Sequence, residues 1–232
     1  KKYLEKFNVK KINYNGNLKF TSEKSNNYLD EKNKEILNTC KFWCAVSTHR
    51  GEDNFCIQTH LKIKKSVKNL ITIIIPRHIN RSDEIELSFK KLNLKSQVLS
   101  DGELIERDKE IVIINSYGSI SKYLSICKSV FIGKSMVKSL ELVGGQNPIE
   151  AAKSGCKIYH GPYVYNFQEV YDLLNKYRIS EQINTIDELA NNLSIDFNKS
   201  NIIEKEKIEI IDNLGKQILD DTCDELNKLI NK

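Results

Sequence analysis

Short apolar runs alternate with longer amphipathic stretches along most of the chain. The apolar runs, rich in Val, Ile and aromatic residues, are predicted strands: 42–47, 70–75, 96–99, 110–115, 130–133 and 157–160. The amphipathic pattern predicts helices over 52–65, 81–92, 119–128, 148–154, 167–177, 186–193 and about 202–230. Strands that are apolar throughout and separated by helices indicate a parallel sheet covered on both faces. We therefore expect an α/β fold, a Rossmann-like doubly wound parallel sheet, with its ligand site beyond the carboxyl ends of the strands.

The predicted sheet also sets the expected domain organisation. Residues 40–200 would form the Rossmann-like domain, and residues 201–232 a C-terminal helix. Residues 1–39 lack the alternating pattern, which is typical of a lead-in or linker from an N-terminal domain. The chain starts with Lys-Lys rather than Met, so we interpret it as a fragment.

Composition narrows the class of protein. The net charge of the 232 residues is +5, but the lysines are scattered among acidic residues, a pattern that does not favour nucleic-acid binding. Mild basicity fits a phosphorylated ligand or an anionic membrane surface. The six cysteines form no C-x-x-C pair, which indicates reduced thiols in a cytosolic protein. No apolar run approaches the roughly 20 residues that a membrane-spanning helix needs.

Four loops follow predicted strands and should meet at one edge of the sheet. In 47–52, hydroxyls and free amides at a helix start could hold an anion, although Ser and Thr are also ordinary helix caps. The segment Pro76–His78 directly follows the apolar run Ile73–Ile75, and the forked guanidinium of Arg77 could clamp a phosphate or carboxylate there. The third loop, Asn115–Ser119, combines Gly118 with a hydroxyl at a helix start.

The fourth loop, GGQNPIEAAKSGCKIYHGP, holds four of the ten glycines and two of the three prolines. Asn147 is predicted to be the N-cap, Pro148 the first helical residue and Glu150 the third, which is nearly a capping box. The glycine pair before the cap would let a ligand lie close to backbone amides. Glu150 keeps two interpretations, a structural helix cap and a ligand-binding carboxylate.

Other chemistries lack their sequence signatures. The four histidines show no H-x-x-x-H or H-E-x-x-H spacing, and no D-x-D occurs, so we predict neither a metal site nor a cofactor. The G-x-S-x-G elbow, G-x-G-x-x-G and the P-loop are also missing from the sequence.

Taken together, these segments resemble the C-terminal half of 3-deoxy-D-manno-octulosonic acid (Kdo) transferases. These enzymes are GT-B glycosyltransferases that move Kdo from CMP-Kdo onto lipid A precursors. The matching order and spacing cover roughly residues 10–195. The resemblance is carried by Gly16–Phe20, Ser47–His49 with Gly51 and Glu52, Pro76–His78, Gly133 with Ser135, Gly144–Glu150, and Gly161 and Pro162 with Asn166 and Phe167.

The resemblance implies roles for the matching residues. Pro76 and Arg77 would contact the CMP moiety, and Glu150 would accept hydrogen bonds from the ribose hydroxyls. Lys19 matches a lysine thought to steady charge in the transition state. The predicted site residues are, for the donor, Pro76, Arg77, Tyr117, Gly118, Ser119, Asn147, Pro148, Ile149 and Glu150, and, for catalysis, Lys19.

The sequence departs from the family pattern in three places. The family's Asp-Thr-Met-Gly-Glu is Asn115–Ser119 here, which loses two carboxylates, Gln146 replaces a histidine, and Lys138–Leu142 is a small insertion. These departures keep two alternatives open. One is a nucleotide-binding module without catalysis, and the other is half of a GT-B sugar-nucleotide epimerase with a UDP ligand.

The resemblance also implies where the missing functions lie. In this family the N-terminal domain holds the acceptor site, the glutamate general base and the membrane attachment. The chain would then bind CMP-Kdo, and the lipid A precursor and the membrane surface would be partners of the N-terminal domain. We expect a soluble fragment without transfer activity, from a protein at the cytoplasmic face of the bacterial inner membrane.

Overall fold

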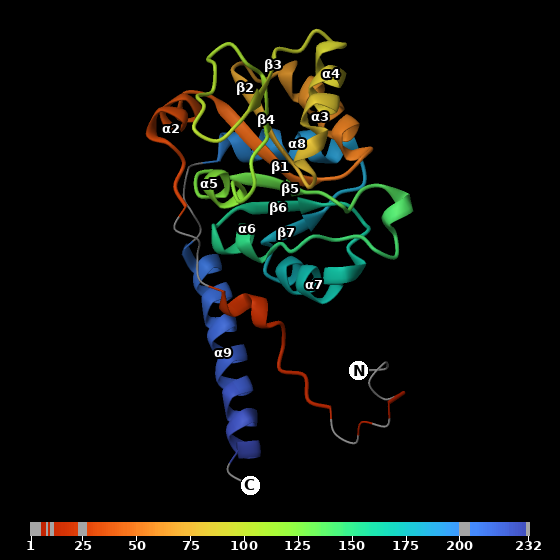
Figure 1. The fold of residues 1–232 in the computed structure, drawn as a ribbon, viewed down its shortest axis with the longest axis vertical. Coiled ribbons are helices and arrows are strands. Elements are labelled where there is room, and N and C mark those ends of the chain that lie inside the picture. The colour runs from red at the N-terminus through yellow and green to blue at the C-terminus, as the bar shows by residue number, and fades with distance from the viewer. Residues whose placement is uncertain (1–5, 8, 10–11, 23–26, 200–204, 231–232) are drawn as a thin grey trace. The chain divides into compact units, whose positions relative to one another are not determined.

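The computed structural model describes residues 6–7, 9, 12–22, 27–199 and 205–230 (Figure 1). Two compact units divide the chain. One comprises Lys1–Glu23 and Glu209–Lys232, and the other comprises Lys24–Ile208. The boundaries that we expected at 39/40 and 200/201 stay predictions.

The larger unit is built around a seven-stranded sheet in which all neighbouring strands are parallel. The order across the sheet is β3-β4-β2-β1-β5-β6-β7. The strands are β1 (Lys41–Thr48), β2 (Leu70–Pro76), β3 (Ser96–Leu99), β4 (Ile111–Ile114), β5 (Ser129–Ile132), β6 (Lys157–His160) and β7 (Ser180–Gln182). The predicted doubly wound parallel fold is confirmed.

Strand β1 lies at the centre, between β2 and β5. Ala45 of β1 is opposite Ile74 of β2 on one side and Phe131 of β5 on the other. The chain builds β2, β3 and β4 on one side of β1 and then returns to start β5 on the other side. This reversal is the topological switch point, where open parallel sheets bind their ligands beyond the carboxyl ends of the strands.

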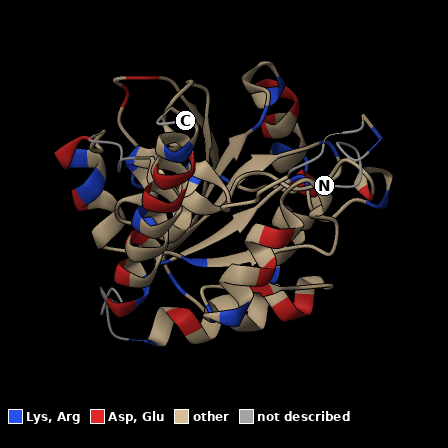
Figure 2. Cartoon of the chain, turned by 90° about the horizontal axis from the view of Figure 1, so that it is seen from below, with Lys and Arg blue, Asp and Glu red and all other residues tan. Residues whose placement is uncertain are grey.

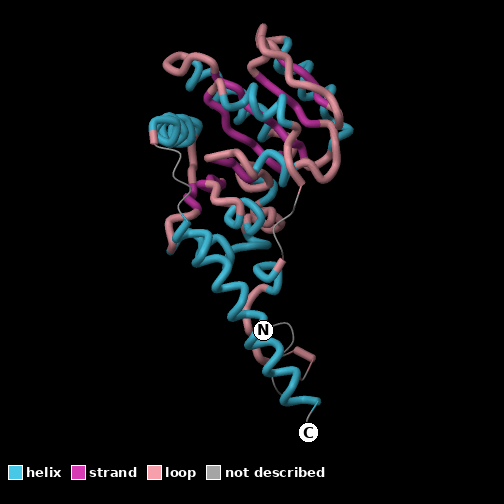
Figure 3. Tube along the Cα trace, turned by 90° about the vertical axis from the view of Figure 1, so that its left-hand side faces the viewer, coloured by secondary structure: helices cyan, strands magenta, loops and turns pink. Residues whose placement is uncertain are grey.

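Helices cover both faces of this sheet. Helices α3, α4 and α8 lie over one face and α5, α6 and α7 over the other (Figure 1), so the strands are enclosed between two helical layers (Figure 3). Acidic and basic residues are intermixed along the helices (Figure 2). The helices of this unit are α2 (Glu31–Asn38), α3 (Glu52–Lys64), α4 (Ser82–Lys90), α5 (Ile120–Leu124), α6 (Ile149–Lys153), α7 (Gln168–Lys176) and α8 (Ile186–Asn198), with short 3-10 turns η2 (Ile79–Arg81), η3 (Lys138–Leu140) and η4 (Tyr165–Phe167).

The core joins the sheet to α3 and α8. Trp43, Ile74 and Phe131 come from the three central strands and are fully enclosed. Phe55 of α3 contacts Phe131 with ring centroids 5.5 Å apart. Burying one such side chain contributes about 1.5–3 kcal/mol, so this layer is a large part of what fixes the central strands in register.

Two elements of the larger unit were not predicted. Helix α2 lies within the segment expected to be a linker. It begins where the Asp30 side chain accepts a hydrogen bond from Lys32 N at 2.9 Å, and it buries Leu37. Strand β7 is the polar triplet Ser180–Gln182, of which only Ser180 is buried. An edge strand this short and polar shows no apolar run in the sequence.

The smaller unit pairs η1 (Leu18–Thr21) with helix α9 (Lys205–Ile230) from residue 209 onward, while the first residues of α9 belong to the larger unit. Asn13 donates from Nδ2 to Glu225 Oε2 at 2.7 Å, and a Cβ atom at Gly215 would collide with the Phe20 carbonyl oxygen. The predicted helical residues 202–204 lie outside the described residues. Within the described part of the chain, no helix combines the length and the apolar character that crossing a membrane requires.

Candidate functional site

The carboxyl edge of the sheet carries nine of the ten predicted site residues. Because all the strands are parallel, the loops that follow β1, β2, β4 and β5 open at this same edge. Helices α5 and α6, which begin after two of these loops, pack beside one another. The tenth residue, Lys19, lies in η1 of the smaller unit, so its proposed role stays a prediction.

Arg77 leaves the end of β2 with its side chain exposed. Its backbone N–H donates to Thr48 O at 3.0 Å, which ties the loop after β2 to the end of β1. Its neighbour Pro76 is buried as the last residue of β2. Within the described part of the chain the Arg77 guanidinium has no ion pair. The arginine is therefore anchored through its backbone, and its charge is available to an anion.

Two histidines lie beside Arg77 at the same edge. The rings of His49 and His78 meet edge to face, with centroids 5.9 Å apart, and His49 Nδ1 is 3.1 Å from Ser47 O. Burial lowers the pKa of His49 below its usual value of 6.5, so this ring is neutral at neutral pH. Our sequence interpretation treated the loop of His49 as a possible anion holder and the loop of His78 as the site of Arg77, and it assigned neither histidine ring a role.

One backbone amide of the loop after β1 and three of the loop after β5 together bind an anionic group of the protein itself, the Glu52 carboxylate. Glu52, at the start of α3, is fully buried. Its Oε2 accepts hydrogen bonds from the backbone N–H of His49 at 2.9 Å and of Lys134 at 2.7 Å. Its Oε1 accepts from Ser135 N at 2.8 Å and Met136 N at 2.9 Å. The cluster of four amides at the switch point, which we call the Glu52 nest, is thus filled from within.

The backbone around the Glu52 nest is strained. Ser47 and Lys134 have positive φ angles of 56° and 59°, which side-chain-bearing residues seldom adopt. A Cβ atom at Gly133 would lie 2.8 Å from Glu52 Oε2 and 2.6 Å from Ser47 O, so only glycine fits there. Strain of this kind, about 1–3 kcal/mol per residue, persists where surrounding contacts impose it, as the Glu52 carboxylate does here.

The loop after β4 carries an exposed aromatic ring and two hydroxyl groups that are hydrogen-bonded to each other. Tyr117 is 80% exposed, and Gly118 has a φ of 72°. Ser119 is buried, and its Oγ lies 2.6 Å from Ser116 Oγ. The hydroxyl of Ser119 is therefore engaged within its own loop, while the Tyr117 ring is open to a ligand.

The loop after β5 ends at α6. Asn147 Oδ1 accepts a hydrogen bond from Ile149 N at 3.1 Å, and α6 begins at Ile149, one residue later than predicted. Glu150 is exposed, and among the described residues no hydrogen bond joins its carboxylate to Asn147 N–H as a capping box requires. Partial burial raises the pKa of Glu150 above its ordinary 4.5. The carboxylate is therefore available to a ligand.

The glycine pair of this loop has an internal explanation. A Cβ atom at Gly144 would collide with the Tyr163 carbonyl oxygen, and Gly144 O accepts from Asn166 N at 3.0 Å. Asn166 Nδ2 also donates to Val143 O at 2.7 Å. The close approach that the sequence suggested is thus between the loops after β5 and β6.

Two carboxylates at this edge already have partners within the protein, so they are not available as metal ligands. Glu52 is saturated by amides, and Asp53 forms a buried ion pair with Arg81. In the described ranges, no group of three or more His, Cys, Asp or Glu residues is placed to hold a metal ion.

The sheet defines the structural class of the chain. A seven-stranded, all-parallel, doubly wound α/β sheet is the Rossmann-like architecture that forms one half of a GT-B fold. The solved C-terminal CMP-Kdo binding domain of WaaA from Acinetobacter baumannii superimposes with a TM-score of 0.65 at 20% identity, covering 82% of this chain and 94% of that one.

The sequence comparisons point to one family within this class. The chain is 27% identical over 225 residues to the 3-deoxy-D-manno-octulosonic acid transferase of Haemophilus influenzae, covering 95% of this chain and 50% of the relative. The protein of the same name from Aquifex aeolicus is 25% identical over 188 residues, covering 81% and 48%. No family model matches the chain.

The chain is therefore a homologue of the Kdo transferases, and the resemblance predicted from the sequence is confirmed. It spans about half the length of the curated relatives that it matches.

Proposed function

We propose that the chain is the donor-binding half of a Kdo transferase, a glycosyltransferase that transfers Kdo from CMP-Kdo to a lipid A precursor in lipopolysaccharide core biosynthesis. The observation that carries the proposal is the open Arg77 side chain at the switch point, in a chain homologous to Kdo transferases. Its donor ligand would be CMP-Kdo. The acceptor, the general base and the contact with the cytoplasmic face of the inner membrane would belong to an N-terminal domain.

Each loop of the carboxyl edge has a part in this proposal. Arg77 would meet the phosphate, because a guanidinium binds phosphate oxygens through paired, charge-assisted hydrogen bonds. Pro76 fixes the backbone just before it. The Tyr117 ring and the Gly118 backbone would lie against the nucleotide, with Ser119 beneath them. Glu150 would accept hydrogen bonds from the ribose hydroxyls, and Asn147 would order the turn of Pro148 and Ile149 that presents Glu150.

Lys19 would steady negative charge on the leaving CMP in the complete enzyme. A lysine ammonium is a compact, strongly hydrated point charge, suited to a phosphate group whose charge grows as the glycosidic bond breaks. This role rests on the sequence match alone.

A second candidate function is nucleotide binding without catalysis. The Ser116–Ser119 hydrogen bond favours it, because Ser119 stands where the family has a glutamate and its hydroxyl is already paired within the loop. In this case the chain would keep the CMP site but lack part of the network that orients the donor.

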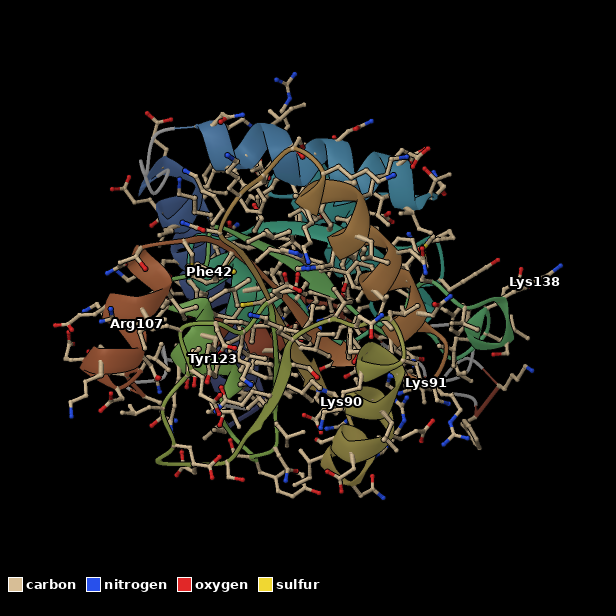
Figure 4. The ribbon with its side chains drawn as sticks, turned by 90° about the horizontal axis from the view of Figure 1, so that it is seen from above. Phe42, Lys90, Lys91, Arg107, Tyr123 and Lys138 are labelled. Carbon is tan, nitrogen blue, oxygen red and sulfur yellow. The ribbon has the colours of Figure 1, made fainter. Side chains whose placement is uncertain are left out.

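Calorimetry with CMP tests the proposal through a matched pair of arginine variants. Arg77→Gln removes the phosphate contact and should weaken CMP binding tenfold or more, since a charged hydrogen bond is worth about 1.5–3 kcal/mol. Arg107→Gln makes the same chemical change at an exposed residue on the far side of the domain from Lys138 (Figure 4) and should leave CMP affinity unchanged. Equal affinities for the two variants would remove Arg77 from the site.

A further inference from the structure

A cavity of about 640 Å³ opens at the amino ends of β1, β5 and β6, the edge of the sheet opposite the proposed donor site. Its volume is in the range of small-molecule binding sites. Six cationic side chains line it, which we call the amino-edge cations: Lys41, Lys128, Lys157, Arg178, Lys199 and Lys207.

The carboxylate that lines the cavity, Asp196, already has hydrogen-bond and ion-pair partners within the protein. Asp196 is buried, and its Oδ2 accepts hydrogen bonds from Ser129 Oγ at 2.8 Å and Tyr159 Oη at 2.6 Å. Its Oδ1 pairs with Lys199 at 2.8 Å. Lys157 pairs with Glu181 at 3.0 Å. Among the described residues, no carboxylate pairs with Lys41, Lys128 or Arg178, which leaves this part of the cavity positively charged.

Lys41 and Lys128 bind neutral carbonyl oxygens instead. Lys41 Nζ donates to Phe197 O at 2.9 Å, and Lys128 Nζ donates to Lys199 O at 3.0 Å. These contacts cap the end of α8, which is one reason for lysines here. An ammonium has three donors, however, so a single carbonyl leaves most of its capacity unused.

The two lysines also repel one another. Burial lowers the pKa of Lys128 below its ordinary 10.5, and the neighbouring charge of Lys41 lowers it further. Within the described chain, the guanidinium of Arg178 has no ion pair, and Arg178 holds a positive φ of 57°. Capping of α8 explains neither why so many cations lie close together here nor why they line a cavity.

Apolar side chains form another part of the wall, which polar residues also line. Leu37, Phe42, Ile179 and Phe197 line the same cavity. Phe42 lies on the side of the domain away from Lys138 (Figure 4). A ligand that satisfies both parts of the wall carries a concentrated negative charge and an apolar portion.

We propose that this amino-edge cavity is a second binding site, for a phosphorylated molecule with an apolar part. A phosphate monoester carries about −1.5 to −2 charges at pH 7 and several strong acceptor oxygens, which match the free donors of Lys41, Lys128 and Arg178. The phosphate can belong to a soluble ester or to a phospholipid headgroup. The experiment distinguishes these sources.

Inorganic pyrophosphate is the first probe, followed by NMR of the backbone amides. Wild-type protein should show shifts at residues 127–130 and 157–158, around the cavity. Lys41→Gln with Lys128→Gln should weaken this binding tenfold or more. Lys90→Gln with Lys91→Gln, the same change of charge at the C-terminal end of α4 (Figure 4), should not weaken it. Arg77→Gln should also leave these shifts unchanged, so failure of the donor site and failure of this site are separable.

Sedimentation with phosphatidic acid vesicles, whose headgroup is a phosphate monoester, against phosphatidylcholine vesicles identifies the source of the phosphate. Binding to phosphatidic acid that the Lys41/Lys128 variant loses assigns the cavity to a lipid headgroup. Pyrophosphate binding without vesicle binding assigns it to a soluble phosphate ester. Pyrophosphate affinity that is equal in the wild type and the Lys41/Lys128 variant, or amide shifts confined to the carboxyl edge, would overturn the proposal.

Discussion

Glu52 shows how a single residue organises the carboxyl edge. Its carboxylate joins the loop after β1 to the loop after β5, across the switch point, through four backbone amides. A carboxylate is the one protein group that can accept all four donors at once while carrying a full negative charge. A ligand phosphate at this edge therefore depends on side chains such as Arg77 for its neutralisation.

Replacing Glu52 tests how much the nest stabilises the fold. In Glu52→Gln the side-chain NH₂ group faces amides that it cannot bond, so we expect the free energy of unfolding to fall by about 3 kcal/mol or more. Urea unfolding measures this loss. The control Glu84→Gln removes an exposed carboxylate that pairs with Arg50, and it should change stability by less than about 1 kcal/mol. Similar effects from both variants would show that the four bonds add little.

Glu150 separates helix capping from ligand binding. Its carboxylate makes no capping-box bond among the described residues, so Glu150→Gln should leave the melting temperature nearly unchanged. If Glu150 binds the ribose, the same variant should bind CMP about tenfold more weakly, because a neutral amide is a poorer acceptor than a carboxylate. Wild-type protein should also prefer CMP to its deoxyribose counterpart. Calorimetry with both nucleotides on both proteins checks this, and four equal affinities would contradict it.

Helix α3 and strand β2 meet around a buried histidine. His60 of α3 is fully enclosed, and its Nδ1 lies 2.9 Å from Thr72 Oγ1 of β2. Burial lowers its pKa to about 4, against about 6.5 in an unfolded chain. Below pH 6.5 the unfolded chain binds a proton here that the folded protein excludes. Stability from this group is therefore present above pH 6.5 and lost as the pH falls toward 4.

The loss of stability on acidification should be measurable by comparison with His60→Gln, because glutamine does not titrate. From pH 6.5 to about 4 the wild-type free energy of unfolding should fall by about 3 kcal/mol more than that of His60→Gln, at 1.36 kcal/mol per pKa unit. Gln can keep the hydrogen bond to Thr72. Chemical unfolding at several pH values provides both curves. Curves that stay parallel over this range would show that His60 titrates alike in both states.

The sequence predicts elements well where burial leaves a pattern. The continuous apolar run of β2 identifies a strand enclosed on both faces, and its predicted end agrees with the structure within one residue. Strand β7 and helix α2 lack such a pattern, because β7 is polar at a sheet edge and α2 buries only Asn33 and Leu37. Their places are set by contacts with the rest of the sheet, which periodicity does not encode.

The candidate site was likewise predicted from the sequence only in part. The parallel direction of the strands and the positions of the loops after them were enough to predict that Arg77, Tyr117 and Asn147 lie at one edge. The Glu52 nest was not predicted, because it unites residues that are 82 to 84 positions apart. The one sequence signal for it was a glutamate at a helix start together with Gly133, and neither residue specifies its partner.

At the scale of the whole molecule, the two edges of the sheet carry different chemistry. The carboxyl edge combines one open arginine, an exposed aromatic ring and an available carboxylate, which suits a nucleotide with a single phosphate. The amino edge gathers six cations around a cavity of about 640 Å³. A chain that spans about half the length of its relatives thus presents two surfaces that differ in their chemical character.

Titration of the chain with CMP and UMP, followed by backbone amide NMR, tests the central claim most directly. Cytosine and uracil present opposite donor and acceptor patterns, so a site shaped for one leaves polar groups unpaired with the other. The account predicts amide shifts in the loops after β2, β4 and β5, with CMP bound at least about tenfold more tightly than UMP. A preference for UMP, or CMP binding that leaves these loops unshifted, would contradict it.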